Sequence, residues 1–220
     1  MILPRDAAGE GINRKMTLYL IRHGQTEGNA GRFVQGNTLV GLTEKGRSQA
    51  KATGKVIKES GIVFDRLFCS DLYRTRQTFS IVFPDEKDRE RVVYDTRLRE
   101  IDNTVIAGRD LAGLVSDYGE FYRDASRRLD YARFGGESSG SIMERARSFF
   151  DYVATECAGC ENVAAVTHGG FITAALCNVI GAPRIDIRAV HIKNCSVSEF
   201  IYSPENNCWI LSKFNNRKEI

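Results

Sequence analysis

The sequence predicts an α/β fold of three layers, α/β/α, with a mostly parallel central sheet and a small helical cap. Short apolar runs rich in β-forming residues alternate with longer amphipathic segments along the chain. This alternation is typical of a sheet that is covered by helices on both faces. The length of 220 residues suits one sizeable domain. We expect a mobile extension or leader over residues 1–16, the domain over 17–220, and the cap over about 101–135.

The first elements follow from apolar runs and a capping residue. Residues 17–21 (TLYLI) form a short β-rich run that predicts a buried strand. The glycine-rich stretch 24–41 predicts a loop. A helix is expected over 44–60, because Thr43 suits its N-cap and the apolar residues keep one face. Residues 66–69 (RLFC) predict a second short strand.

The middle of the chain continues the alternation. A helix is expected over 72–83, and an exposed charged connector over 84–91 follows it. Residues 92–94 predict a short third strand. The arginine- and aromatic-rich stretch 109–134 predicts a helical region that ends at the glycine pair 135–136.

The last third of the chain supplies the remaining strands. Ser141 and Glu144 have the spacing of a capping box, which predicts a helix start at this point. Residues 162–167 (NVAAVT) predict another buried strand, and a further helix follows it. Two final strands are expected over 196–202 and 209–214, with a turn between them.

Composition and charge exclude several classes of function. The apolar fraction of 42% and the charged fraction of 27% are ordinary for a globular protein. A net charge of +3 without a long basic run predicts no nucleic-acid partner. No stretch approaches the ~20 apolar residues of a membrane span, and residues 1–16 lack an apolar signal segment. Membrane association is therefore not expected.

The six cysteines indicate a reducing compartment. Cys157 and Cys160 have the C-x-x-C spacing of a zinc or redox pair, but no second pair lies at ligand spacing. Packed, reduced thiols are the simpler interpretation, and we expect a cytoplasmic protein.

Polar side chains follow three of the expected strands at the point where each strand ends. Arg22 and His23 follow the first strand, Ser70 and then Arg74 follow the second, and His168 follows the strand at 162–167. Because ligands bind outside the carboxyl ends of such strands, we expect these side chains to share one site. Arginine forks suit phosphate oxygens, and a neutral histidine can attack phosphorus. The set therefore predicts chemistry on a phosphoryl group.

Seven short motifs occur in the order of a known family. They are LIRHGQTEGN (20–29), QG (35–36), LTEKG (42–46), SDLYRTRQT (70–78), LREID (98–102), GES (136–138) and THGG (167–170). Together they resemble the histidine phosphatase superfamily, which includes the cofactor-dependent phosphoglycerate mutases. The resemblance covers roughly residues 17–202.

The resemblance implies a role for each matched residue. His23 matches the histidine that becomes phosphorylated, and Arg22 and Arg74 match the arginines that hold the phosphoryl oxygens. His168 matches a second pocket histidine. Glu100 matches the proton donor that later activates water. The matched positions that line the pocket are Asn29, Gln35, Gly36 and Gly169. The family uses no metal for this step, so neither a metal nor another cofactor is expected.

Three functions remain open within the resemblance. Glycolytic mutases of the family carry a longer insertion before the GES motif, whereas only 37 positions separate Glu100 from Glu137 here. A mutase must shield its phosphohistidine from water, which a short cap makes harder. We therefore expect a metal-independent phosphomonoesterase of the phosphatase branch that acts on a small phosphorylated metabolite. The alternatives are a cofactor-dependent phosphoglycerate mutase and a catalytically inactive phosphate-binding or scaffold protein. The presence of both His23 and Glu100 argues against the inactive protein.

One departure from the family bears on the substrate. Family members often follow the LRE segment with a glycine, an aromatic residue and Glu-Gly, whereas residues 101–108 read IDNTVIAG. Aromatic and basic residues of the cap are candidates for contacting the non-reacting part of a substrate, unless they only pack on the domain. They are Tyr118, Phe121, Tyr122, Arg123, Arg127, Arg128, Tyr131 and Arg133. The expected partners are a small phosphate ester and, because dimers are common in the family, a second copy of the chain.

Overall fold

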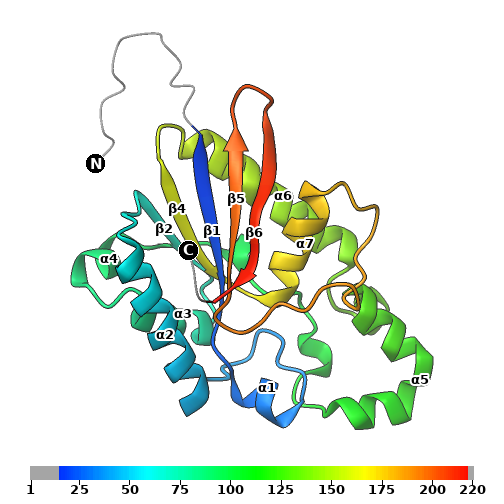
Figure 1. The fold of residues 1–220 in the computed structure, drawn as a ribbon. Coiled ribbons are helices and arrows are strands. Elements are labelled where there is room, and N and C mark those ends of the chain that lie inside the picture. The colour runs from blue at the N-terminus through cyan, green and yellow to red at the C-terminus, as the bar shows by residue number, and fades with distance from the viewer. Residues whose placement is uncertain (1–14, 218–220) are drawn as a thin grey trace.

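The sheet places the N-terminal strand near its middle. In the computed structural model, which describes residues 15–217, the strand order is β3-β2-β4-β1-β5-β6 (Figure 1). The strands are β1 (Met16–Arg22), β2 (Arg66–Cys69), β3 (Val93–Tyr94), β4 (Asn162–Thr167), β5 (Val197–Ser203) and β6 (Cys208–Asn216). The first four pair in parallel, and β5 pairs antiparallel with both β1 and β6. The prediction of a mostly parallel sheet is confirmed.

Helices cover both faces of this sheet. They are α1 (Glu27–Gly31), α2 (Glu44–Ser60), α3 (Tyr73–Val82), α4 (Glu86–Arg91), α5 (Leu111–Arg128), α6 (Ser139–Glu156) and α7 (Gly169–Val179). Short 3₁₀ turns occupy Thr96–Leu98, Thr104–Ile106 and Ala132–Phe134. Figure 1 shows α2 and α3 on one side of the sheet and α6 and α7 on the other. The three-layer α/β/α prediction is confirmed.

Alternate residues of β1 belong to two separate cores. Leu18 and Leu20 lie in the core that includes buried residues of α5, α6 and α7. Tyr19 and Ile21 lie in the core that includes buried residues of α2 and α3. Since successive strand side chains point to opposite faces, burial on both faces explains the unbroken apolar run of this strand.

The expected extension over residues 1–16 lies outside the described residues except for its last two positions. The structure places Met16 in β1, opposite Tyr202 of β5, so the sheet begins one residue earlier than predicted.

Two stretches that the sequence predicts to be irregular contain short helices. Residues 24–41 include α1, which begins after Thr26, and the side chains of Thr26 and Asn29 each accept a hydrogen bond from the other residue's backbone N–H. This local capping outweighs the glycine content of the stretch. Residues 84–91 include α4, in which Asp88 pairs with Arg91 three positions on.

The predicted capping box at 141–144 is wrong. Helix α6 begins earlier, at Ser139, because the Ser138 hydroxyl accepts the hydrogen bond from the Ser141 N–H at 3.1 Å. The Ser141 hydroxyl instead donates to Oε1 of Glu137, at 3.1 Å.

The cap segment is formed mainly by α5, which Figure 1 shows at the lower right, beyond the carboxyl ends of the parallel strands. This helix kinks at Gly119, where φ is 53° and ψ is −130°, a conformation that favours glycine. Leu114 and Tyr122, on either side of the kink, are buried against the domain.

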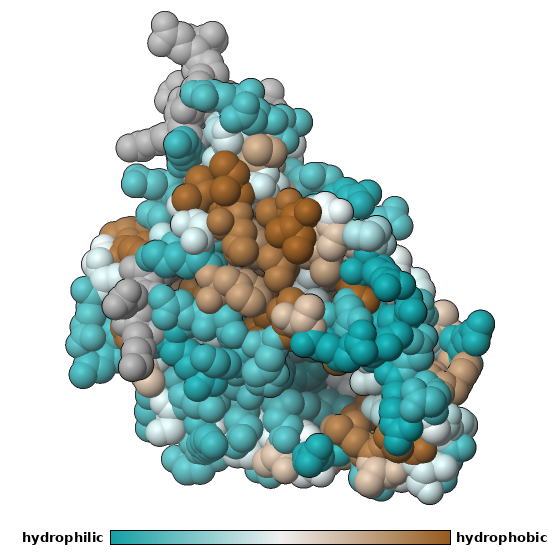
Figure 2. Space-filling view, turned by 45° about the vertical axis from the view of Figure 1, so that its right-hand side comes forward, coloured by the Kyte–Doolittle hydropathy of each residue, from teal (hydrophilic) through white to brown (hydrophobic). Residues whose placement is uncertain are grey.

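The surface is of mixed polarity. Figure 2 shows an apolar area at the centre of one side and mostly hydrophilic surface below it. Within residues 15–217, no helix is long and apolar enough to cross a membrane.

The core between the sheet and α6 depends on Phe149. Its side chain is fully buried, and its ring centroid lies 5.5 Å from that of Phe68 and 5.9 Å from that of Phe171. We expect Phe149→Ala to lower the free energy of unfolding by about 3–5 kcal/mol in urea titration. The control Leu39→Ala removes a side chain that is 86% exposed and should stay within about 0.5 kcal/mol of the wild type. An equally small effect of Phe149→Ala would contradict this description of the core.

Candidate active site

Three neighbouring strands end side by side, each before a residue of the candidate site. Strand pairing sets Arg22 opposite Thr167 and Cys69 opposite Val166. The residues that follow continue the ladder, because His23 N–H donates to the Thr167 carbonyl and Ser70 N–H donates to the Val166 carbonyl, both at 2.9 Å. The register of the sheet therefore brings together segments that lie far apart in the sequence.

The local contacts of His23 determine its tautomer. Its ring is buried, and Nδ1 lies 2.7 Å from the Gly24 carbonyl oxygen. A carbonyl oxygen only accepts hydrogen bonds, so Nδ1 carries the proton and Nε2 keeps its lone pair. Burial, then the charges of Arg74 and Arg22, hold the pKa of His23 well below its usual value. The ring is therefore neutral at pH 7.

His168 lies behind His23, with 5.1 Å between the two ring centroids. Its Nε2 is 2.9 Å from the Ser70 hydroxyl, while its buried Nδ1 has no hydrogen-bond partner among the described residues. Burial and the charge of Arg74 are the main causes that hold its pKa well below the usual histidine value. Buried polar atoms without partners are rare in folded proteins, and here the atom belongs to the candidate site.

The two arginines are held by backbone carbonyls rather than by carboxylates. Arg22 Nη1 donates to the Ile192 carbonyl, and Arg74 Nη2 donates to the Gly36 carbonyl at 3.0 Å. Burial lowers the pKa of Arg74 to about 10, so the group remains charged at pH 7. Three buried nitrogens of these two arginines have no hydrogen-bond partner in the part of the chain that the structure describes. They are Arg22 Nε, Arg74 Nε and Arg74 Nη1. These donors suit an anion.

Glu100 is held by two backbone N–H groups. Its Oε1 accepts from Ile101 N–H at 3.0 Å, and its Oε2 accepts from Gly170 N–H at 3.2 Å. The Gly170 N–H belongs to the first turn of α7, where the helix dipole favours a carboxylate. A Cβ at Gly170 would lie 2.1 Å from Oε1. Any larger residue at this position would therefore displace the carboxylate.

The ion pair between Arg145 and Glu137 holds the segment that carries Glu100 in place. Arg145 Nη1 donates to the carbonyls of Arg97 and Arg99, at 2.6 and 2.8 Å, and its Nη2 donates to Glu137 at 2.7 Å. Glu137 also accepts from the Asp102 N–H at 3.0 Å. Backbone on both sides of Glu100 is thus fixed by one arginine and one carboxylate.

A cavity of about 190 Å³ opens above the histidine and the arginines. Arg22, His23, Arg74 and Glu100 line it, and so do Asn29, Gln35 and Gly36 from the segment around α1. His168 and Gly169 do not line the cavity. Gly169 lies against the Arg22 guanidinium, where a Cβ would be 3.3 Å from Nε.

The cap candidates divide into two groups. Tyr122 and Tyr131 line the cavity and are buried, whereas Tyr118 and Phe121 pack against Phe134 at ring distances of 5.2 and 4.9 Å. The cap arginines mostly make ion pairs with carboxylates of the cap itself. These pairs are Arg123 with Glu120, and Arg127 and Arg128 with Asp124. Arg133 stacks over the Phe121 ring.

Several residues near the cavity were not predicted from the sequence. Asn103 and Ser126 line it, and Asn194 donates to the His23 carbonyl at 3.1 Å. The sequence of residues 101–108 differs from the family pattern, and this difference could have pointed to Asn103 as a residue of the cavity wall. Nothing in the sequence around Asn194 indicated its proximity to His23.

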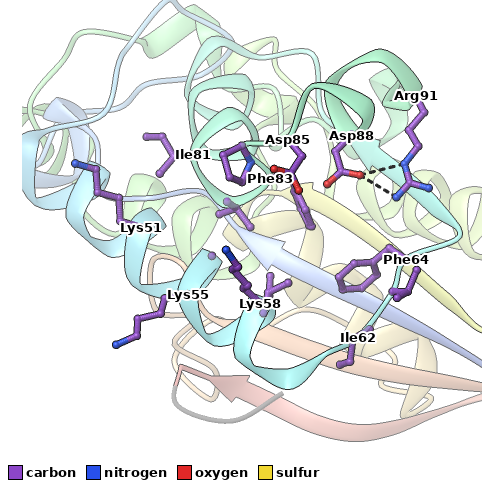
Figure 3. Close-up of a pocket in the computed structure, with 15 residues that line it drawn as sticks. Lys51, Lys55, Lys58, Ile62, Phe64, Ile81, Phe83, Asp85, Asp88 and Arg91 are labelled. Carbon is purple, nitrogen blue, oxygen red and sulfur yellow. Dashed lines mark hydrogen bonds and ion pairs between the residues drawn. The ribbon is translucent and has the colours of Figure 1, made fainter.

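A larger cavity of about 520 Å³ lies between α2 and the segment from α3 to α4 (Figure 3). Apolar side chains such as Phe64 and Ile81 line it, with Lys51, Lys55 and Lys58 on α2. None of the residues of the candidate site contributes to this cavity. The size of a cavity therefore does not identify the candidate site. The presence of the histidine and the two arginines identifies it.

Within residues 15–217, no group of three or more His, Cys, Asp or Glu side chains is arranged to hold a metal ion. The six cysteines are all free thiols, and burial raises the pKa of Cys157 to about 12.

Residues 18–217 match the family model of the histidine phosphatase superfamily (branch 1). The chain belongs to the histidine phosphatase superfamily. The resemblance inferred from the seven motifs is thereby confirmed, and the match covers the cap and all of the sheet except the first two residues of β1.

Relatives and solved structures agree with this membership. A probable phosphoglycerate mutase, GpmB, of Erwinia tasmaniensis is 30% identical over 198 residues, which are 90% of this chain and 89% of that protein. The mycobacterial glucosyl-3-phosphoglycerate phosphatase Rv2419c, solved with VO3, has 28% identity and a TM-score of 0.76, covering 91% of this chain and 98% of that one. Bacillus stearothermophilus YhfR has 25% identity and a TM-score of 0.81, covering 91% and 97%. This superfamily member is thus an enzyme of the histidine-phosphatase type.

The unpartnered arginine donors predict that inorganic phosphate binds in the cavity. At a phosphate concentration of about 100 times Kd, binding should stabilise the fold by ~2.7 kcal/mol and raise Tm by about 5–10 °C in a thermal melt. Arg74→Met should abolish this rise. The control Arg76→Met should keep it, because Arg76 is exposed on the same helix and stacks on Tyr94. An unchanged phosphate response in Arg74→Met would contradict the assignment of the cavity.

Proposed function

We propose that this protein is a metal-independent phosphomonoesterase that forms a phosphohistidine at His23 and acts on a small phosphorylated metabolite. The observation that carries the proposal is the neutral His23 ring, with its lone pair on Nε2, in a cavity that also holds unpartnered arginine N–H groups. A neutral imidazole is a competent nucleophile toward phosphorus, and the arginines offset the charge of the phosphoryl oxygens.

The first step transfers the phosphoryl group to the enzyme. Nε2 of His23 forms a bond to phosphorus while the ester P–O bond breaks. Glu100, in its acid form, gives its proton to the leaving oxygen, so the product is an alcohol. The Nδ1–H stays bonded to the Gly24 carbonyl, which stabilises the charge that the ring gains. Arg22 and Arg74 donate to the phosphoryl oxygens during the transfer, and His168, which lies behind the cavity lining, has its unpartnered Nδ1 to donate as well.

The second step releases inorganic phosphate. The Glu100 carboxylate accepts a proton from a water molecule whose oxygen forms a bond to phosphorus. The bond between phosphorus and Nε2 breaks, and its electron pair returns to the ring of His23. Both residues then have their starting protonation states, so the cycle consumes one ester and one water molecule.

The cap determines whether the phosphohistidine is hydrolysed by water or passes its phosphoryl group to a second substrate. The names of the relatives include both a probable phosphoglycerate mutase and a phosphatase. The segment between Glu100 and Glu137 is short and is filled mainly by the single kinked helix α5. A cap of this size gives water a shorter route to the phosphohistidine, which favours hydrolysis. A phosphoglycerate mutase remains the second candidate.

The proposed setting is cytoplasmic. Free cysteines, including the buried Cys69, Cys177 and Cys195, fit a reducing compartment. The proposed partner is a small phosphate ester. A homodimer stays a prediction from the family resemblance.

The role of His23 can be tested by phosphate release with chelator present. We expect His23→Ala to lower turnover by about 10³-fold or more, because the nucleophile is lost. The control is His191→Ala, which removes an exposed histidine outside the cavity and should keep wild-type turnover. Trapping acid-labile ³²P on the wild type, but not on His23→Ala, identifies the intermediate. Near-wild-type turnover of His23→Ala would contradict the proposed mechanism. Loss of activity in the presence of chelator would contradict the proposal that the enzyme needs no metal.

The role of Glu100 can be tested by varying the leaving group. A protonated leaving oxygen matters more for an alkyl phosphate than for an aryl phosphate, whose phenolate leaves readily. We expect Glu100→Gln to lower kcat/KM, which reports the transfer to His23 and not the later hydrolysis, by about 10²–10⁴-fold for alkyl phosphates and much less for aryl phosphates. The control Glu120→Gln changes an exposed carboxylate of the cap and should alter neither value. Equal losses for both ester classes would show that Glu100 is not the proton donor.

A further inference from the structure

The cations of the catalytic cavity are all engaged with one phosphoryl group. Among the described residues that line the cavity, Arg22, Arg74 and His23 are the basic ones. All three lie at the floor, around the position of the phosphoryl group in the proposed mechanism. His23 is neutral, so two positive charges remain, and a phosphate monoester dianion balances them.

The walls around the leaving group carry no compensating charge. Apolar side chains form much of the wall, including Phe33, Val34 and Leu111. The one carboxylate that lines the cavity, Glu100, repels a second anion whenever it is ionised. A carboxylate or second phosphate on the substrate would therefore lose solvation and gain no cationic partner.

The cap arginines do not supply the missing cation. Arg123, Arg127 and Arg128 lie in the same helix as the cavity residues Tyr122 and Ser126, but they pair with cap carboxylates. None of these three arginines lines the cavity itself. Each of the three is already engaged by a carboxylate, with Arg127 and Arg128 sharing Asp124, so recruiting one of them for a substrate anion would cost an existing ion pair.

The cavity instead offers neutral hydroxyl groups. The hydroxyls of Tyr122 and Tyr131 both lie close to Ser126. Burial raises the pKa of Tyr122 to about 12 and also raises that of Tyr131, so both phenols keep their protons. Such groups donate to and accept from the hydroxyls of a sugar-like or polyol leaving group.

The cavity is also small. Its volume of about 190 Å³ holds the phosphoryl group and the adjoining part of the leaving group, and a neighbouring cavity of about 410 Å³ shares Leu111, Tyr122 and Ser126 with it. The volume of the catalytic cavity itself is below the ~300–1,000 Å³ that is typical of sites for drug-sized ligands.

From the charge, the hydroxyls and the size of the cavity, we infer that the substrate is the phosphate monoester of a small, uncharged, hydroxyl-bearing alcohol without a second anionic group. The inference rests on the phosphomonoesterase function proposed above. It excludes phosphoglycerates and bisphosphates as preferred substrates, and so it also argues against the mutase.

Two nearly isosteric substrates test the inference. Glycerol 3-phosphate and 3-phosphoglycerate share a three-carbon skeleton, and they differ in a neutral CH₂OH against a carboxylate. We expect kcat/KM for glycerol 3-phosphate to exceed that for 3-phosphoglycerate by about tenfold or more, measured as phosphate release with chelator present. An aryl phosphate serves as the control for the chemistry.

A charge-introducing variant tests the physical cause. Ser126 is partly exposed on α5, so a longer side chain can be accommodated there. Ser126→Lys should shift the ratio of the two kcat/KM values toward 3-phosphoglycerate by about tenfold or more. Ser126→Met adds similar length without charge and should leave the ratio near that of the wild type.

The outcomes separate the two proposals. If the wild type releases phosphate from the aryl ester and prefers 3-phosphoglycerate or does not discriminate, the inference fails and the phosphomonoesterase function stands. If no ester releases phosphate, the proposed function fails and the inference falls with it. An identical shift of the ratio in Ser126→Lys and Ser126→Met would show that size rather than charge controls selection, which would also overturn the inference.

Discussion

The site depends on positive charge that is kept buried without a carboxylate partner. An ordinary ion pair would neutralise Arg22 and Arg74 and would leave no net positive charge for a substrate anion. The fold holds both guanidinium groups through backbone carbonyls, those of Ile192 and Gly36, which orient the groups without cancelling their charge. A backbone carbonyl also orients His23, because its Nδ1–H donates a hydrogen bond to the Gly24 carbonyl. Burial, together with the field of these cations, keeps the pKa values of both histidines low, so the rings are neutral.

The proton donor is positioned by separate elements. Glu100 takes its two hydrogen bonds from backbone N–H groups, one of them at the start of α7. The segment that carries it is fixed by Arg145 and Glu137, which lie in and just before α6. This separation keeps a carboxylate at the cavity without letting it pair directly with either arginine. The glutamate of the GES motif therefore has a structural part in the site through Arg145.

Much of the fold and the gathering of site residues could be predicted from the sequence, because both depend on local patterns. Apolar runs gave the strands to within about two residues at either end, and polar residues at three strand ends converge once those strands are parallel. The helix starts at Thr26 and Ser138 were missed, since capping by one hydroxyl is decided by backbone geometry rather than by composition. Contacts such as Asn194 with His23 depend on long-range packing and leave no local pattern.

The groups that bind the phosphoryl group and the residues that contact the leaving group come from different parts of the fold. One phosphoryl-binding site can therefore be combined with different substrate specificities. The phosphoryl-binding groups lie at strand ends, where the hydrogen-bond register fixes their spacing. The cavity walls come from α1, the 101–108 segment and α5, none of which is constrained by the sheet. Ile101 and Asn103, which occupy the segment that departs from the family pattern, both line the cavity. A substitution in these walls alters which leaving group fits and leaves His23, Arg22 and Arg74 undisturbed. Sequence divergence at the cap therefore changes substrate specificity while the phosphoryl-transfer reaction stays the same.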